Sequence, residues 1–114
     1  MGLFSFGKKP AEPFEFLIED AFAIRSGGTV VAGRMLSGSL PQGAKVLCVP
    51  VSGASFVCQV KSIEQPDPEH QGEYVHPREA RSGGPFGGHY AFLIPNRRRE
   101  DFQPGAKLLS PEAK

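Results

Sequence analysis

The chain has 114 residues and a net charge of +1, which suits one domain with an ordinary core. The near-neutral charge weighs against a nucleic-acid binder with a broad basic face, although a small basic site remains compatible with it. Two cysteines without C-x-x-C spacing exclude a zinc framework, and no segment approaches the roughly 20 apolar residues of a membrane span, so a cytoplasmic protein without membrane contact is predicted.

Residues 1–13 mix charges and prolines, and they are predicted to be a flexible tail. Residues 14–24 then alternate with a period of two, which is typical of a strand with one buried face. The apolar positions of this alternation are Phe14, Phe16, Ile18, Phe22 and Ile24. Asp20 interrupts them, and a carboxylate on the apolar side must lie at a rim, be hydrogen-bonded or face a ligand.

The β-branched residues 29–36 predict a second strand, in which Gly33 indicates a bulge or a close backbone approach. Residues 45–51 and 55–64 predict two more strands around a turn at 52–54. If that hairpin is symmetric about Gly53, Cys48 faces Cys58. Since the cytoplasm is reducing, two free neighbouring thiols are predicted.

The remaining chain alternates loops with short apolar runs. Residues 65–78 form the longest gap, in which Tyr74 and Val75 could add a short edge pairing. Residues 89–94 and 106–110 predict the last two strands, and residues 111–114 a tail. Six short strands with many Gly and Pro residues predict an all-β fold, namely a six-stranded closed antiparallel β-barrel over residues 14–110.

Several short motifs occur in a fixed order along residues 14–110. They are G-T-V-V-A-G-R from Gly28, G-S-L-P-Q-G-A-K-V from Gly38, V-K-S-I-E from Val60, A-R-S-G from Ala80 and R-E-D-F-Q-P-G from Arg99. Together they resemble the second domain of elongation factor Tu and other translational GTPases, here without the GTPase domain. The resemblance implies a six-stranded barrel of the translation-protein type, in agreement with the separate strand count.

In that family the barrel helps to hold the aminoacylated end of transfer RNA. The resemblance implies binding roles for residues that match the family positions: Glu19, Asp20, Phe22, Ile24 and Glu64. Two family positions differ, because Ala32 replaces a threonine and Asp67 replaces a basic residue. A second interpretation stays open, in which Phe22 and Ile24 are core residues and Glu19 is a solvated strand residue.

No catalytic, cofactor or metal site is predicted. Gly28 and Gly33 have the spacing of a phosphate loop, but Arg34 and Met35 stand where Lys and Ser or Thr are needed, so no nucleotide is expected. The histidines lack metal-ligand spacing, and no serine or cysteine has the context of a nucleophile.

The densest basic spot is Arg97-Arg98-Arg99, which makes these residues candidate phosphate contacts, although Glu100 and Asp101 favour a solvated turn. Two functional hypotheses follow. The first is a non-catalytic domain that contacts transfer RNA, ribosomal RNA or a translation factor. The alternative is a protein–protein interaction module that keeps the barrel but has lost RNA binding. The sequence does not specify an oligomeric state.

Overall fold

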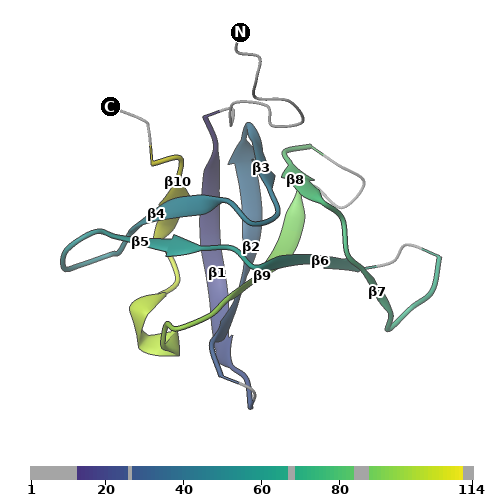
Figure 1. The fold of residues 1–114 in the computed structure, drawn as a ribbon. Helices are drawn as coiled ribbons and strands as arrows, with labels where there is room; N and C mark the ends of the chain where they lie inside the picture. Colours follow the sequence, from purple (N-terminus) through teal and green to yellow (C-terminus); the bar gives the residue numbers. More distant parts are fainter. Residues whose placement is uncertain (1–12, 26, 67–68, 84–87, 112–114) are drawn as a thin grey trace, which may run out of the picture.

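The structure, a computed structural model, describes residues 13–25, 27–66, 69–83 and 88–111. These residues form ten β-strands and one 3-10 helix (Figure 1). The elements are β1 (Glu15–Ala23), β2 (Thr29–Ser37), β3 (Ser39–Pro41), β4 (Lys45–Val49), β5 (Phe56–Gln59), β6 (Ser62–Pro66), β7 (Tyr74–Val75), β8 (Glu79–Arg81), β9 (His89–Ile94), η2 (Arg99–Asp101) and β10 (Lys107–Leu109). The two predicted tails lie almost wholly outside the described residues, so their flexibility stays a prediction.

Eight strands form one sheet in the order β5-β4-β10-β1-β2-β9-β6-β7, and β3 and β8 pair with each other. Every pairing is antiparallel. The two longest strands, β1 and β2, lie at the centre, and Figure 1 shows β4 and β5 running across them. The prediction of an all-β antiparallel fold is therefore confirmed.

β5 and β6 belong to one run of chain that bends at Val60 and Lys61. The backbone N–H of Val60 donates to the carbonyl of Ala44 at 3.0 Å, and that of Lys61 donates to the carbonyl of Leu93 at 2.8 Å. The first half of this run thus pairs with β4 and the second half with β9, near opposite ends of the sheet order. No pairing among the described strands joins β5 to β6, so closure into a barrel is not detected.

Among the described residues, ten strands replace the six predicted, because one predicted strand is divided in two and three predicted loops contain short strands. The predicted strand over residues 55–64 is divided at the bend between β5 and β6. The predicted loop over residues 37–43 contains β3, which starts anew because Gly38, at a φ of +73°, turns the chain after β2. β3 pairs with β8 from the glycine-rich segment, and the edge pairing of Tyr74 and Val75 with β6 is confirmed.

The β4–β5 hairpin has another register than predicted. Cys48 faces Phe56 and Cys58 faces Val46, so the pairing is symmetric about Ser52 and the prediction that Cys48 faces Cys58 is wrong. The turn is centred one residue earlier than a turn at 52–54 would be, which shifts the register by two residues. A shift of two preserves the face, so both cysteines stay on one side of the hairpin. Both are free thiols, Cys48 buried and Cys58 half-buried.

The core consists of the inward-facing side chains of the long strands. Phe16 of β1 and Phe92 of β9 are fully buried, with ring centroids 4.5 Å apart. Each such side chain contributes about 1.5–3 kcal/mol when it is removed from water. Between them Gly33 lets β1 and β2 approach, because a Cβ there would lie 2.0 Å from the carbonyl oxygen of Leu17. The close approach predicted at Gly33 is confirmed.

Candidate functional site

A β-bulge in β1 decides which residues of this strand face outward. Ile18 pairs with Gly33 and Asp20 with Ala32, so Glu19 is the extra residue without a partner in β2. The inward-facing side chains are therefore at even-numbered positions up to Ile18 and at Ala21 after the bulge. Ile18 and Ala21 are buried, and Asp20 and Phe22 are exposed. The bulge reverses the predicted alternation, so the interpretation of Phe22 as a core residue is wrong, while the exposed position of Asp20 is compatible with the predicted alternatives of a rim or a ligand-facing site.

The register places outward-facing residues of four strands in two rows. Asp20 of β1, Ala32 of β2, Ala91 of β9 and Glu64 of β6 form one row. Phe22, Val30, Leu93 and Ser62 form the neighbouring row. We call these eight residues the four-strand face. It brings together three of the predicted binding residues, although Glu64 lies far along the sequence from the other two.

The four-strand face combines an apolar centre with carboxylates at both ends of one row. Phe22 is 46% exposed, whereas phenylalanine is among the residue types most often buried. Ala32 and Ala91 are small and leave room above the sheet between the carboxylates of Asp20 and Glu64. Neighbouring strands lie about 4.8 Å apart, so these two residues are separated by about 14 Å. Such a surface can receive a flat ring and accept hydrogen bonds at its borders.

Ionisable residues border the four-strand face on the side of the bulge. Glu19 Oε1 lies 3.7 Å from His89 Nε2, and both side chains are partly exposed. Arg34 lies between Leu17 and His89 in the register, and its buried Nε has no hydrogen-bond partner among the described residues. Arg34 and His89 were not singled out from the sequence as site residues; the period of two along a strand places Arg34 on the same side as Ala32 and His89 on the same side as Ala91.

Ile24, the remaining predicted binding residue of this strand, is placed differently. Ile24 follows the end of β1 and is half-buried, and it takes part in the turn into β2, where its N–H donates to the carbonyl of Gly28 at 3.3 Å. Asp67 is outside the described residues. On the sheet, the Asp20 carboxylate accepts a hydrogen bond from the backbone N–H of Ala21 at 2.8 Å, so it is satisfied locally while exposed.

The arginines 97–99 follow β9 and are not part of the four-strand face. The Arg97 guanidinium lies 3.8 Å from the ring centroid of Phe56 and 3.7 Å from Asp101 Oδ2, a cation–π contact and an ion pair. The backbone N–H of Arg98 donates to the same oxygen at 3.0 Å. Arg99 begins η2 and is exposed. Asp101 therefore fixes the backbone of this segment.

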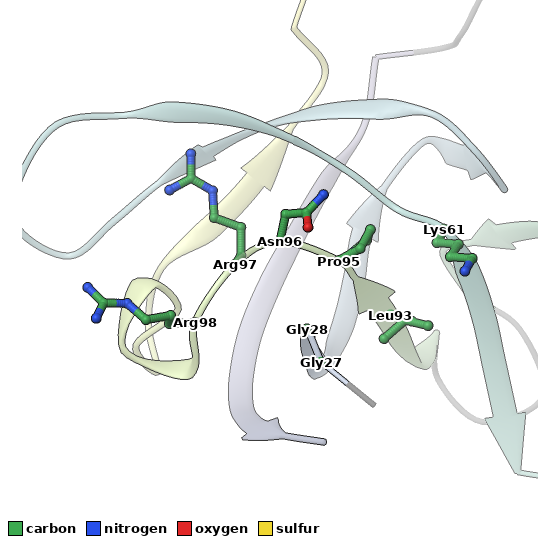
Figure 2. A pocket seen from close by; sticks show the side chains of 8 residues that line it. All are labelled: Gly27, Gly28, Lys61, Leu93, Pro95, Asn96, Arg97 and Arg98. Atoms are coloured by element: carbon green, nitrogen blue, oxygen red, sulfur yellow. The ribbon is translucent and has the colours of Figure 1, made fainter. Parts of the chain in front are cut away.

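A cleft of about 460 Å³ lies between the β1–β2 turn and the end of β9 (Figure 2). We call it the cation cleft because three of its lining side chains are basic. Its described lining residues are Gly27, Gly28, Lys61, Leu93, Pro95, Asn96, Arg97 and Arg98. Leu93 belongs both to the cation cleft and to the four-strand face, so the two surfaces are continuous.

The described residues contain no group of three or more His, Cys, Asp or Glu side chains that could hold a metal ion. In the same part of the chain, no helix is long and apolar enough to cross a membrane. The stretch from Gly28 to Gly33 with the spacing of a phosphate loop belongs almost entirely to β2, which is paired on both edges.

Comparison with solved structures finds a crystal structure of the bacterial selenocysteine-specific elongation factor EF-Sec. The match has a TM-score of 0.67 at 22% sequence identity, and it covers 90% of this chain and 15% of that protein. The fold resembles a β domain of a translational GTPase. The resemblance suggested by the sequence motifs is thus confirmed for the fold. No family model matches the chain, and no curated protein does.

The small share of the elongation factor that is matched limits the likeness to one domain. The residues described in this chain form strands and one 3-10 helix, so they contain no GTPase fold.

Proposed function

We propose that the chain is a non-catalytic, cytoplasmic binding domain that acts in translation. Its four-strand face contacts RNA or a translation factor. The RNA is the acceptor end of transfer RNA or ribosomal RNA. The observation that carries the proposal is the exposed Phe22 beside the row from Asp20 to Glu64. The motifs shared with elongation factor Tu and the fold shared with EF-Sec support a role in translation.

The chemistry of the face suits the unpaired end of an RNA strand. A base can stack on the exposed ring of Phe22, because every base has an aromatic face. The carboxylates of Asp20 and Glu64 can accept hydrogen bonds from ribose hydroxyl groups. The 2′-hydroxyl group is present in RNA and absent from DNA. Ala32 and Ala91 leave the space that a sugar or base needs above the sheet. None of these contacts requires a nucleotide cofactor or a metal.

Binding of a short single-stranded RNA to three forms of the full chain tests the proposal. Base stacking on an aromatic side chain is worth about 1–3 kcal/mol, so Phe22→Ala should weaken binding by about 5-fold to 150-fold. Tyr74→Ala is the control, because Tyr74 is an aromatic residue on the sheet with 58% exposure outside the four-strand face. Equal affinity of the Phe22→Ala variant and the unchanged chain would contradict the proposal.

The two RNA partners and the translation factor are separated by the choice of probe. Transfer RNA with an intact 3′ end is compared with the same RNA shortened by its last nucleotide. A preference for the intact form favours the acceptor end, whereas equal binding together with retention on ribosomes favours ribosomal RNA. Retention of a translation factor in the absence of RNA identifies the third partner.

A protein–protein interaction module without RNA binding is the second candidate function. It is favoured by the two carboxylates on the four-strand face and by the net charge of only +1. RNA binding through phosphates weakens steeply with salt. A chain that retains a protein partner at moderate salt, and binds no RNA at low salt, would establish this alternative.

A further inference from the structure

The cation cleft has a different charge from the four-strand face beside it. Three of its eight described lining residues are basic, and no described carboxylate lines it. The basic residues come from two separate parts of the chain: Lys61 from the bend before β6, and Arg97 and Arg98 from the segment after β9. The fold thus brings three basic side chains together, although the net charge of the whole chain is only +1.

The three cations differ in how far their charge is already compensated. Arg97 stacks on Phe56 and pairs with Asp101, so much of its charge is used within the protein. Neither Lys61 nor Arg98 forms an ion pair with a carboxylate of the described residues. Figure 2 shows these two side chains at opposite ends of the cation cleft, with Leu93 and Pro95 between them.

Part of the wall of the cation cleft, at Gly27 and Gly28, is backbone without side chains. Gly27 and Gly28 have φ values of +100° and +91°, and a Cβ on Gly28 would lie 3.0 Å from the carbonyl oxygen of Ile94. Asn96 also has a positive φ, at 63°. Because the two glycines carry no side chain, a ligand can approach the backbone closely at this part of the wall.

We propose that the cation cleft binds phosphodiester groups of a single-stranded RNA whose neighbouring nucleotide lies on the four-strand face. This inference rests on the proposed function. Leu93 is shared by the two surfaces, so a strand that leaves the face on the side of Phe22 and Val30 enters the cleft. Lys61 and Arg98 lie at opposite ends of the cation cleft, which fits successive phosphates of one strand better than a single phosphate held by both. Leu93 and Pro95 between them offer apolar contact to a sugar or base.

The test is an NMR titration of the ¹⁵N-labelled full chain with a single-stranded RNA pentanucleotide. The chemical shifts of the backbone amides are measured at each RNA concentration. The amides of Gly27, Gly28 and Asn96 report on the cation cleft, and those of Phe22 and Ala32 report on the four-strand face. The result expected is a change in both groups with the same dissociation constant.

A double variant measures the neutralisation of phosphates directly. On a single strand, each phosphate that a protein cation neutralises contributes about 0.7 to the slope of log affinity against log salt, so Lys61→Gln with Arg98→Gln should lower the slope by about 1.4. The matched control is Lys45→Gln with Arg78→Gln, which removes two exposed cations outside the cation cleft and should leave the slope unchanged. An equal slope for the two double variants would overturn the inference.

The titration separates failure of this inference from failure of the proposed function. Shifts confined to Phe22 and Ala32 would overturn the cation cleft as a site and leave the face as an RNA surface. Shifts confined to the cleft amides would support a phosphodiester site and contradict the role of the face. No shift at either place overturns both. A hexaglutamate peptide that binds the cleft as tightly as the RNA would show that the site takes acidic protein segments instead.

Discussion

The hydroxyl group of Thr29 donates a hydrogen bond to the backbone carbonyl of Arg97 at 2.8 Å. Thr29 is fully buried at the start of β2, and it connects the first long strand pair to the segment that carries the arginines. The bond crosses 68 residues of sequence, so it fixes one wall of the cation cleft to the sheet.

Thr29→Val should destabilise the chain by about 1–3 kcal/mol, because it leaves the carbonyl of Arg97 without this partner in a partly buried place. Thr29→Ser keeps the hydroxyl group and should lose less stability than Thr29→Val. Urea unfolding followed by circular dichroism measures both. A Thr29→Val variant as stable as the unchanged chain would show that the bond is replaced by water.

Gly33→Ala should be among the most damaging single substitutions. The added Cβ would lie 2.0 Å from the carbonyl oxygen of Leu17, and backbone atoms of two central strands cannot move apart without breaking their pairing. We expect a loss of more than about 3 kcal/mol or a chain that does not fold. Gly53→Ala is the control, since nothing lies within 4 Å of its Cβ position and only the positive φ is strained. Comparable losses from the two variants in thermal unfolding would contradict the prediction.

Asp20→Ala should lower the free energy of unfolding by no more than about 0.5 kcal/mol. The carboxylate is exposed beyond the bulge, and its hydrogen bond goes only to the adjacent N–H of Ala21. Under the proposed function the same variant should weaken RNA binding. If Asp20→Ala instead destabilises the chain by about 2 kcal/mol or more, on the scale of a buried hydrogen-bonded group, the outward orientation after the bulge is wrong.

The stability of the chain should fall above about pH 9 because of its two cysteines. Burial raises the pKa of Cys48 to about 11 and that of Cys58 to about 12. The unfolded chain releases these protons near pH 9, whereas the folded chain still retains them, so the unfolded state gains relative stability as the pH rises. The stabilisation is complete below about pH 9 and is lost towards pH 12.

Urea unfolding at pH 8 and pH 10 checks this dependence. The variant Cys48→Ala with Cys58→Ala serves as the control, because lysines and tyrosines titrate in the same range in both proteins. The unchanged chain should lose more stability between the two pH values than the variant does. A difference between the two proteins that stays constant with pH would show that the thiols are not protected from ionisation.

Much of the fold could be predicted from the pattern of apolar residues. Residues 89–94 form an uninterrupted run that is apolar after His89, and β9 has these bounds. The bulge in β1 could not be predicted, because a glutamate such as Glu19 is not a residue type that marks a bulge. Only the pairing of Ile18 with Gly33 and of Asp20 with Ala32 reveals it. A window of local sequence contains no information on that partner strand.

The candidate site was predictable in part for the same reason. Motif resemblance selected Asp20, Phe22 and Glu64, which the register then brings to one face. The cation cleft was missed, apart from its arginines, because Lys61 joins Arg98 only through the pairing of β6 with β9. Similarly, the turn between Cys48 and Cys58 offered two centres, and the sequence did not distinguish them.

The bend at Val60 and Lys61 has a consequence for the order in which the chain folds. The β4–β5 hairpin joins near neighbours, such as Cys48 and Phe56, and its loop is short and fast to close. The β6–β9 ladder joins Ser62 to Leu93, a distant and slower contact. Since β5 continues directly into β6, we expect early formation of the hairpin to hold one end of the slow loop in position, and the rate of assembly to depend on closing the connection 67–88 between β6 and β9.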